Sequence, residues 1–135
     1  MAHTHQIRIY YSHTDAGGIV YHARYLDFAE HARTELLRLI SNNQEHQKKI
    51  MQATEVGFVV TAISVDYHSP AFLDDVLSVI TTVEQLKRFS MTFLQKIERD
   101  GQKIATLKVK VASISQKSLK PIPLESWFTE AVNAL

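Results

Sequence analysis

The chain has 135 residues, of which 45% are hydrophobic and 21% are charged, so it has the composition of a globular domain with a sizeable core. Fifteen basic and fourteen acidic residues give a formal net charge of +1, which argues against a nucleic-acid-binding protein. The absence of cysteine excludes disulfides, thiolate metal sites and a cysteine nucleophile.

The spacing of glycine and histidine excludes further enzyme classes. Four glycines, at positions 17, 18, 57 and 101, cannot form the G-x-S-x-G motif of serine hydrolases or the glycine-rich loops that bind dinucleotides and nucleoside triphosphates. No two histidines lie four residues apart, which removes the H-E-x-x-H zinc motif. The N-terminus does not resemble a signal peptide, and no apolar stretch is long enough for a membrane helix, so we expect a cytoplasmic protein.

The first third of the chain predicts a strand, a turn and a long helix. Ile7 to Tyr11 is rich in β-branched and aromatic residues, which favours a strand. TDAGG, residues 14–18, predicts a turn that needs the conformational freedom of glycine. From about His22 to Ile40 apolar residues recur at helical spacing, and charged residues occupy the face expected to contact water. Those charged residues are Arg24, Asp27, Glu30, Arg33 and Arg38.

Strand patterns dominate the second half. After SNNQEHQKK, residues 41–49, which predicts a polar linker or a ragged helix end, Val56 to Tyr67 begins apolar on both faces and predicts a strand covered on two sides. The segment HSPAFLDD interrupts the pattern, and Val76 to Leu86 is a second long run of strand type.

The end of the chain predicts a hairpin and a helix. Ser90 to Glu98 and Ala105 to Val111 each alternate apolar and polar residues, and Asp100-Gly101 between them is a strong two-residue hairpin signal. Apolar residues between Leu124 and Ala131 predict a short helix after the prolines at 121 and 123.

These elements predict one α+β domain over residues 1–135, in which a long, curved antiparallel sheet wraps around the long helix. The sequence shows no internal repeat and no second domain. Exposed sheet edges and strands that are apolar on both faces indicate a homo-oligomer, because unpaired edges tend to aggregate.

The most informative segment is YYSHTDAGGIVYHARYLDFAEHARTELLR, residues 10–38. It places Asp15, two glycines and His22 directly before the long helix, whose first N–H groups have no partner inside the helix. A carboxylate beside such amides indicates a site that binds and polarises a carbonyl group. On pattern alone, however, an aspartate before two glycines is more often part of an Asx-turn or a helix cap.

The chain resembles the hotdog-fold acyl-CoA thioesterases, most closely the 4-hydroxybenzoyl-CoA thioesterase family and its Tol-Pal-associated branch. The resemblance is carried by residues 10–38, by FVVTAISVDYHSPAFLDDVL and by LKRFSMTF, and with weaker patterns it covers most of the chain. It implies a helix wrapped by a five-stranded antiparallel sheet, with dimers that pair into a larger sheet and often form tetramers. It also implies thioester hydrolysis without a metal or a cofactor.

The resemblance also assigns residues to the reaction. Asp15 falls on the catalytic aspartate of the family, and His22 and Tyr11 fall on its frequent partners. Many relatives carry an acidic residue where this chain has His13, so the charge beside the catalytic acid differs here.

A second group of residues is assigned to coenzyme A. Lys87 and Arg88 match the basic run that contacts phosphate in the better-known branch, and Ser90 completes the predicted contact. Phe89 replaces a basic residue of that run, which is a second departure from the family pattern.

The residues therefore predict an acyl-CoA thioesterase in which Asp15 either attacks the thioester, giving a mixed anhydride, or acts as general base for water. Amides near Tyr21 to Ala23 would polarise the carbonyl, and His22 would orient the substrate or transfer a proton. Two alternatives remain open, a non-catalytic module that binds acyl groups or acyl carrier protein, and a hydratase on the same fold. Acyl-CoA or acyl carrier protein is the expected partner, and both a dimer and a tetramer fit the pattern.

Overall fold

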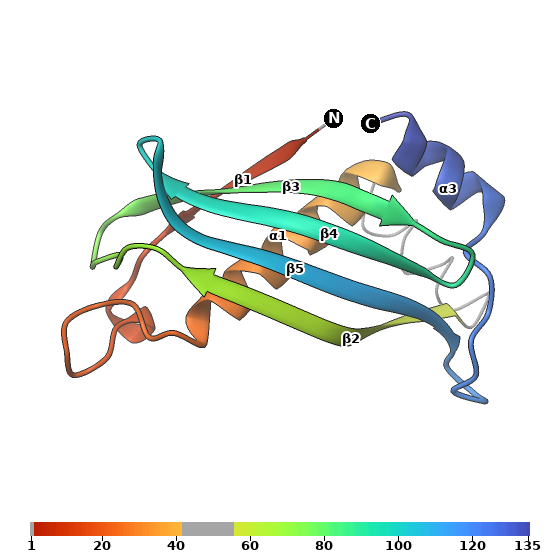
Figure 1. The fold of residues 1–135 in the computed structure, drawn as a ribbon, viewed down its shortest axis with the longest axis horizontal. Coiled ribbons are helices and arrows are strands. Elements are labelled where there is room, and N and C mark those ends of the chain that lie inside the picture. The colour runs from red at the N-terminus through yellow and green to blue at the C-terminus, as the bar shows by residue number, and fades with distance from the viewer. Residues whose placement is uncertain (1, 42–55) are drawn as a thin grey trace.

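The computed structural model describes residues 2–41 and 56–135, which form a five-stranded antiparallel sheet with the long helix on one face (Figure 1). Helix α1 crosses behind the strands, and the short helix α3 lies beside one end of the sheet (Figure 1). The elements are β1 (His3–Arg8), the 3₁₀ turn η1 (Tyr11–His13), α1 (Arg24–Ile40), β2 (Val56–Tyr67), β3 (Val76–Leu86), β4 (Ser90–Arg99), β5 (Gln102–Ser115) and α3 (Ser126–Asn133).

The sheet has the strand order β1-β3-β4-β5-β2, and every neighbouring pair is antiparallel. The predicted α+β class is confirmed. The predicted hairpin is confirmed too, because Asp100 and Gly101 connect β4 to β5 with φ angles of 49° and 81°. Two successive positive φ angles match the twist of the flanking strands, which explains why Asp-Gly is favoured there.

Helix α1 packs its apolar face against the sheet. The buried residues of the helix are Tyr25, Phe28, Ala29, Ala32 and Leu36. They meet side chains from the inner face of the sheet, such as Leu77, Phe93 and Leu107, all nearly inaccessible to solvent. Burial of each large apolar side chain contributes about 1.5–3 kcal/mol, so this face holds the helix in place. The helix begins at Arg24 instead of His22 because the Arg24 amide closes a tight turn onto the Tyr21 carbonyl.

The first strand lies earlier in the chain than predicted. The prediction of a strand from Ile7 to Tyr11 is wrong at both ends, since β1 covers His3–Arg8 and Tyr11 begins η1. Residues 3–8 pair with residues 76–81 of β3, so a polar segment becomes a strand because it has a partner. Pairing within a sheet often overrides the intrinsic preference of the residues.

Strand β2 has the predicted bounds but not the predicted environment. It is an edge strand, and β5 is its neighbour in the sheet. Val56 and Gly57 are buried, whereas Val59, Val60 and Ile63 are each more than 40% exposed. The prediction of a strand covered on two sides is therefore wrong for most of β2 in a single chain, because successive side chains, which point to opposite faces, are exposed beyond its first residues.

The C-terminal helix is confirmed at Ser126–Asn133, where Phe128 and Val132 are buried. Of the predicted polar linker at 41–49, only Ser41, which ends α1, lies within the described residues. In the described part of the chain, none of the helices has both the length and the apolar character needed to span a bilayer.

Candidate functional site

The segment between β1 and α1 forms a small hairpin that carries Asp15. The Asp15 amide donates to the Ile19 carbonyl at 3.0 Å, and the Tyr21 amide donates to the His13 carbonyl at 2.9 Å. An isolated bridge between Thr14 and Val20 lies between these two bonds. The segment that contains Asp15 is thus paired with the segment that leads directly into α1.

The carboxylate of Asp15 closes a turn and remains exposed. Its Oδ1 atom accepts a hydrogen bond from the Gly17 amide at 2.8 Å, which is the Asx-turn that the sequence pattern favours. A Cβ atom at Gly17 would lie 3.1 Å from that oxygen, so a side chain there would require the carboxylate to shift by a few tenths of an ångström. Gly18 has a φ of +83°, which also favours glycine. Within the described residues no hydrogen bond reaches Oδ2, so one oxygen of Asp15 is free to meet a substrate or water.

An open cleft of about 500 Å³ lies against Asp15. It is lined by Tyr11, Thr14, Asp15, Ala16, Gly18 and Leu73. The side chain of Tyr11 is strongly exposed, and the backbone carbonyl of the same residue accepts a hydrogen bond from the Thr14 hydroxyl at 2.7 Å. The structure therefore brings two of the predicted site residues, Asp15 and Tyr11, to one cleft, although no hydrogen bond joins them in the described part of the chain.

His22 lies just before the first turn of α1 and is not among the residues that line this cleft. Its backbone carbonyl accepts a hydrogen bond from the Tyr67 hydroxyl at 3.0 Å, and its ring centroid lies 4.4 Å from that of Tyr21. Tyr67 also packs edge-on against Tyr25 of the helix. The end of β2 thus holds the entrance of α1 in position.

Tyr67 is a site-supporting residue that the sequence analysis did not identify. Its signal was weak, since an aromatic residue at the end of an apolar strand usually serves packing. The hydroxyl group became informative only once β2 and the start of α1 were seen to be neighbours.

Two backbone amides at the entrance of α1 have no acceptor. The Tyr21 amide donates a hydrogen bond to the His13 carbonyl, and the helix begins at Arg24. Between them, the amides of His22 and Ala23 donate no hydrogen bond within residues 2–41 and 56–135. Such unpaired N–H groups can stabilise negative charge on an oxygen atom.

A second loop, residues 68–75, supports the first. The Val20 amide donates to Ala71, and the backbones of Ile9 and the Asp74–Asp75 pair exchange two hydrogen bonds of 2.9 Å. Oδ2 of Asp75 accepts from the Arg99 guanidinium at 2.6 Å and from the Phe72 amide at 2.8 Å. This largely buried ion pair fixes the loop of residues 68–75, and with it Leu73, at the wall of the cleft.

His13, the departure from the family pattern, faces the protein interior. Its Nδ1 atom accepts a hydrogen bond from the Tyr10 amide at 2.9 Å, and its ring packs edge-on against Phe28 at 5.0 Å. Burial lowers the pKa of His13 below its ordinary value, and the charge of Arg24 acts in the same direction. The ring is therefore neutral at pH 7, which is the form that accepts the Tyr10 bond.

The predicted coenzyme A contacts lie at the opposite end of the sheet. Lys87 and Arg88 form the turn between β3 and β4, Ser90 is the first residue of β4, and the Arg88 guanidinium stacks on the Phe89 ring at 5.2 Å. Strand β3 begins beside the Asp15 loop and ends at this turn (Figure 1). A strand of its 11 residues spans roughly 35 Å. A single chain therefore does not bring the basic turn and Asp15 together.

The described residues contain no group of three or more His, Asp or Glu side chains that could hold a metal ion. What the Asp15 end offers is a free carboxylate oxygen, unpaired amides and an open cleft. Those groups are suited to the hydrolysis of an activated carbonyl compound by a carboxylate.

Comparisons with known proteins show the family of the chain. The model of the thioesterase-like superfamily matches residues 11–132. The acyl-CoA thioesterase YbgC of Haemophilus influenzae is 40% identical to this chain, over 86% of this chain and 83% of the relative. The acyl-CoA thioester hydrolase YbgC of Escherichia coli O6:H1 is 37% identical, over 85% of this chain and 84% of the relative. The crystal structure of a probable thioesterase from Bartonella henselae, 32% identical, aligns with a TM-score of 0.85 over 93% of this chain and 100% of that one.

Proposed function

Because the chain belongs to the thioesterase-like superfamily, we propose that it hydrolyses acyl-CoA thioesters to a free acid and coenzyme A, with Asp15 as the catalytic carboxylate. The observation that carries the proposal is the Asp15 carboxylate, which is exposed in a cleft and has one oxygen free of hydrogen bonds from the described residues. The names of the two YbgC relatives support the choice of acyl-CoA as the substrate.

Two routes use the same groups. In the first, Oδ2 of Asp15 adds to the thioester carbon, the carbon–sulfur bond breaks, the thiolate leaves, and water hydrolyses the resulting anhydride. In the second, Asp15 takes a proton from water, the hydroxide adds to the carbon, the carbon–sulfur bond breaks, and the proton held by Asp15 passes to the leaving thiolate or to the medium. In both routes the amides of His22 and Ala23 would stabilise the oxyanion, an interaction worth roughly a hundredfold to a thousandfold in rate per donor.

His22 and Tyr11 have supporting roles in this proposal. Tyr11, which lines the cleft, would hold the substrate or the carboxylate. His22, held at its carbonyl by Tyr67, would orient the substrate or water or transfer a proton.

A homodimer would complete the site. The open edge of β2, with exposed Val59, Val60 and Ile63, is suited to pair with the β2 strand of a second copy. Antiparallel pairing of the two β2 strands relates the two subunits by a twofold axis, so opposite ends of the two sheets lie side by side. It places the partner's basic turn, with Lys87, Arg88 and Ser90 of the partner subunit, at the end of the joint sheet where this chain carries Asp15. The two halves of the predicted site would then come from different subunits.

The test is thiol release from a panel of acyl-CoA substrates by the wild type and by Asp15→Asn. An asparagine oxygen can still accept the Gly17 bond, so the loop should keep its shape. We expect kcat to fall by at least about a hundredfold, because an amide is neither a nucleophile nor a base. The matched control is Asp74→Asn at the same end of the sheet, where the φ of 70° suits asparagine. Unchanged turnover in Asp15→Asn would falsify the assignment, and a wild type inactive on every thioester would favour the binding module.

A further inference from the structure

A narrow groove separates the middle of α1 from the sheet on the side of β2. Its volume is about 180 Å³, close to that of a protein cavity that takes up one benzene ring. The sheet side is entirely apolar and consists of Phe58, Val60, Met91, Phe93 and Val111. The polar side chains come from the helix, and one of them is Arg33. We call this feature the Arg33 groove.

The position of Arg33 is set by a buried amide. Its Nη1 atom donates to Oε1 of Gln95 at 2.9 Å. Gln95 is fully buried on β4, and its Nε2 atom donates to the Ala29 carbonyl at 2.9 Å and to the Thr81 hydroxyl at 3.0 Å. Because the amide nitrogen has two acceptors, the oxygen must be the end that faces Arg33. Arg33 was expected on the face of α1 that contacts water, and that expectation is wrong, since the side chain is partly buried against Gln95.

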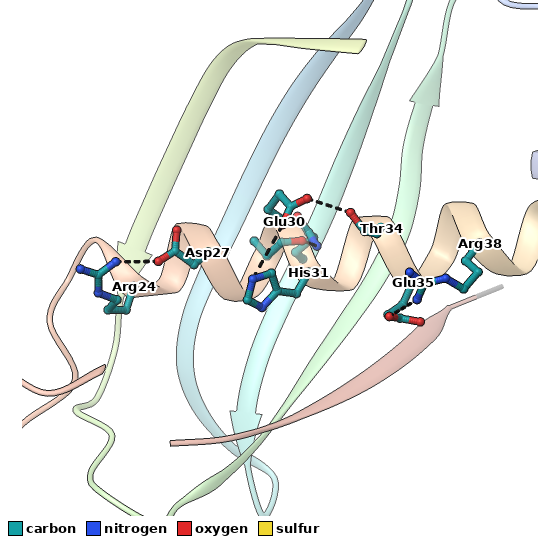
Figure 2. Close-up of polar contacts among 9 residues, drawn as sticks. Arg24, Asp27, Glu30, His31, Thr34, Glu35 and Arg38 are labelled. Atoms are coloured by element: carbon teal, nitrogen blue, oxygen red, sulfur yellow. Dashed lines mark hydrogen bonds and ion pairs between the residues drawn. The ribbon is translucent and has the colours of Figure 1, made fainter. Parts of the chain in front are cut away.

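Arg33 differs from the other two arginines of α1. Arg24 pairs with Asp27 at 2.8 Å, and Arg38 pairs with Glu35, both with an acid three residues away (Figure 2). Arg33 is more buried than Arg24, yet no carboxylate lies within 4.0 Å of its guanidinium in residues 2–41 and 56–135.

The acid nearest to Arg33 on the helix is engaged elsewhere. Glu30 also lines the groove, but its Oε1 atom accepts a hydrogen bond from the Thr34 hydroxyl at 2.8 Å, and its Oε2 atom lies 3.9 Å from Nε2 of His31 (Figure 2). More than half of the Glu30 side chain is exposed to solvent. It therefore compensates the charge of Arg33 only weakly.

Partial burial without a counter-ion leaves Arg33 in need of an anion. Burial is the main cause that lowers the pKa of Arg33 from its ordinary value, and the charge of Glu30 opposes it. The guanidinium nevertheless stays charged at any physiological pH and offers several N–H donors besides the one used by Gln95. A carboxylate can accept two of them side by side, which is the strongest pairing available to arginine.

We propose that the Arg33 groove is a binding site for a carboxylate carried on an apolar body about as large as one ring. The body lies against the apolar sheet side of the groove, and the carboxylate accepts hydrogen bonds from Arg33. The carboxylate has two possible sources. It belongs either to a free carboxylic acid or to a second acid group at the far end of the acyl chain of a thioester, and this second source rests on the proposed function.

The binding test uses hexanoate and its neutral counterpart hexanol, titrated into isotopically labelled protein and followed by NMR chemical shifts. We expect the wild type to bind hexanoate at least about ten times more tightly than hexanol, because a hydrogen-bonded charge is lost in the alcohol. Arg33→Met keeps the apolar stem and should abolish the difference. Arg38→Met, an equal change at a surface ion pair on the same helix, should preserve it.

A second variant tests the groove without changing Arg33, so the test does not depend on the folding of Arg33→Met alone. Val60→Phe fills the groove from an exposed position and leaves the Arg33–Gln95 bond in place. Because Val60 also lies on the open edge of β2, sedimentation velocity must first show that the variant keeps the oligomeric state of the wild type. The variant should weaken both ligands by about tenfold. Equal affinity of the wild type for acid and alcohol, or hexanoate binding unaffected by Arg33→Met or by Val60→Phe, would overturn the proposal.

The two sources are separated by turnover of adipoyl-CoA and hexanoyl-CoA. A preference of the wild type for adipoyl-CoA that Arg33→Met removes identifies the acyl chain as the source. Hexanoate binding that depends on Arg33, without such a preference, identifies a free acid. If neither thioester is hydrolysed, the proposed function fails, whereas the hexanoate titration still decides the proposal made here.

Discussion

At one end of the sheet, backbone hydrogen bonds hold the loop that carries Asp15 in place. Residues 13–15 pair with residues 19–21, and Val20 and Ile9, on either side of Asp15, bond to residues 71–75. At the other end, the turn that carries Lys87 and Arg88 is anchored through its backbone to Ser90, Ser113 and Leu124, while both cationic side chains extend into solvent. One end holds an acid in a braced cleft. The other presents positive charge on exposed side chains.

If the proposed function is right, this difference is a division of labour between an acid that acts on the substrate and cations that bind it. A catalytic carboxylate has to be positioned within fractions of an ångström, which requires a braced loop. Exposed cations on a turn, such as Lys87 and Arg88, could instead attract phosphate by charge over a longer range. Since the two ends are separated by the length of β3, a site that used both of them would require a second subunit. The predictions below test this division.

The largest effect should follow from disrupting the open edge of β2. Val59→Lys/Ile63→Lys places like charges on the strand that would face its own copy. We expect a monomer in sedimentation velocity and a loss of kcat/KM of at least about tenfold, because the basic turn of the partner subunit would be absent.

The control for the edge variant is Leu39→Lys/Leu119→Lys, which adds the same charge at exposed leucines outside β2. It should keep both the oligomeric state and the activity. Full activity of a monomeric edge variant would show that the Asp15 end works without a partner.

A subunit-mixing experiment should give the next largest effect. Asp15→Asn should be inactive, and Lys87→Ala/Arg88→Ala should be weak at low substrate concentration. If the two ends come from different subunits, refolding an equal mixture creates one complete site in each mixed dimer. The expected recovery is about a quarter of the wild-type activity, since half of the dimers are mixed and each has one intact site of two. Activity that stays at the average of the two parents would place both ends of the site in the same chain.

The basic turn should affect substrate binding about tenfold. In Lys87→Ala/Arg88→Ala we expect KM for acyl-CoA to rise by about that factor while kcat changes less than about twofold, because contacts remote from the reacting carbon bind ground state and transition state alike. The increase should be larger at low ionic strength, where screening is weak.

Lys108→Ala/Lys110→Ala is the matched control for the basic turn. It removes the same charge from β5, where Lys108 pairs with Glu84 on the outer side of the sheet. Steady-state kinetics at two salt concentrations should show little change in this variant. An equal rise in KM would mean that net charge, and not the turn, attracts the substrate.

The smallest effect concerns pH and is confined to the Asp15 end. The pKa of His13 is lower in the folded protein than its ordinary value, so the unfolded chain binds the proton more readily. The stabilisation from neutral His13 is therefore complete above the unfolded pKa of about 6.5 and is lost as the pH falls through the folded pKa. The melting temperature should decline from pH 7 to pH 5.

His13→Asn removes the titrating group and keeps an acceptor for the Tyr10 amide. The decline with acid should become shallower by a few degrees at most. Parallel melting curves for the two proteins across this pH range would show that the His13 bond does not contribute to the pH dependence.

Much of the fold was predictable from local pattern. Strands β2 and β3, the hairpin at Asp100-Gly101 and nearly all of α1 have the predicted positions, because apolar periodicity and glycine position act over a few residues. The Asp15 turn was predictable for the same reason. His3–Arg8 was not, since its strand conformation comes from pairing with β3, more than 60 residues away.

Arg33 and Gln95 show where local pattern was insufficient. Gln95 occupies the buried register of β4 together with Met91, Phe93 and Ile97, so a polar residue on an apolar face was a visible signal. Its meaning depended on Arg33, which lies 62 positions earlier on another element. A buried amide becomes a ligand for a guanidinium only when helix and sheet are packed together.

The amino-acid sequence by itself determined most of the secondary structure other than β1, the thioesterase-like family and the loop that presents Asp15, because each depends mainly on patterns of residues close together in the chain. Only the tertiary structure decided that β2 lies at an open edge, that the basic turn lies at the opposite end from Asp15, and that Arg33 faces a groove. Those properties depend on strand order and direction, which arise when distant segments bury their apolar faces against one another.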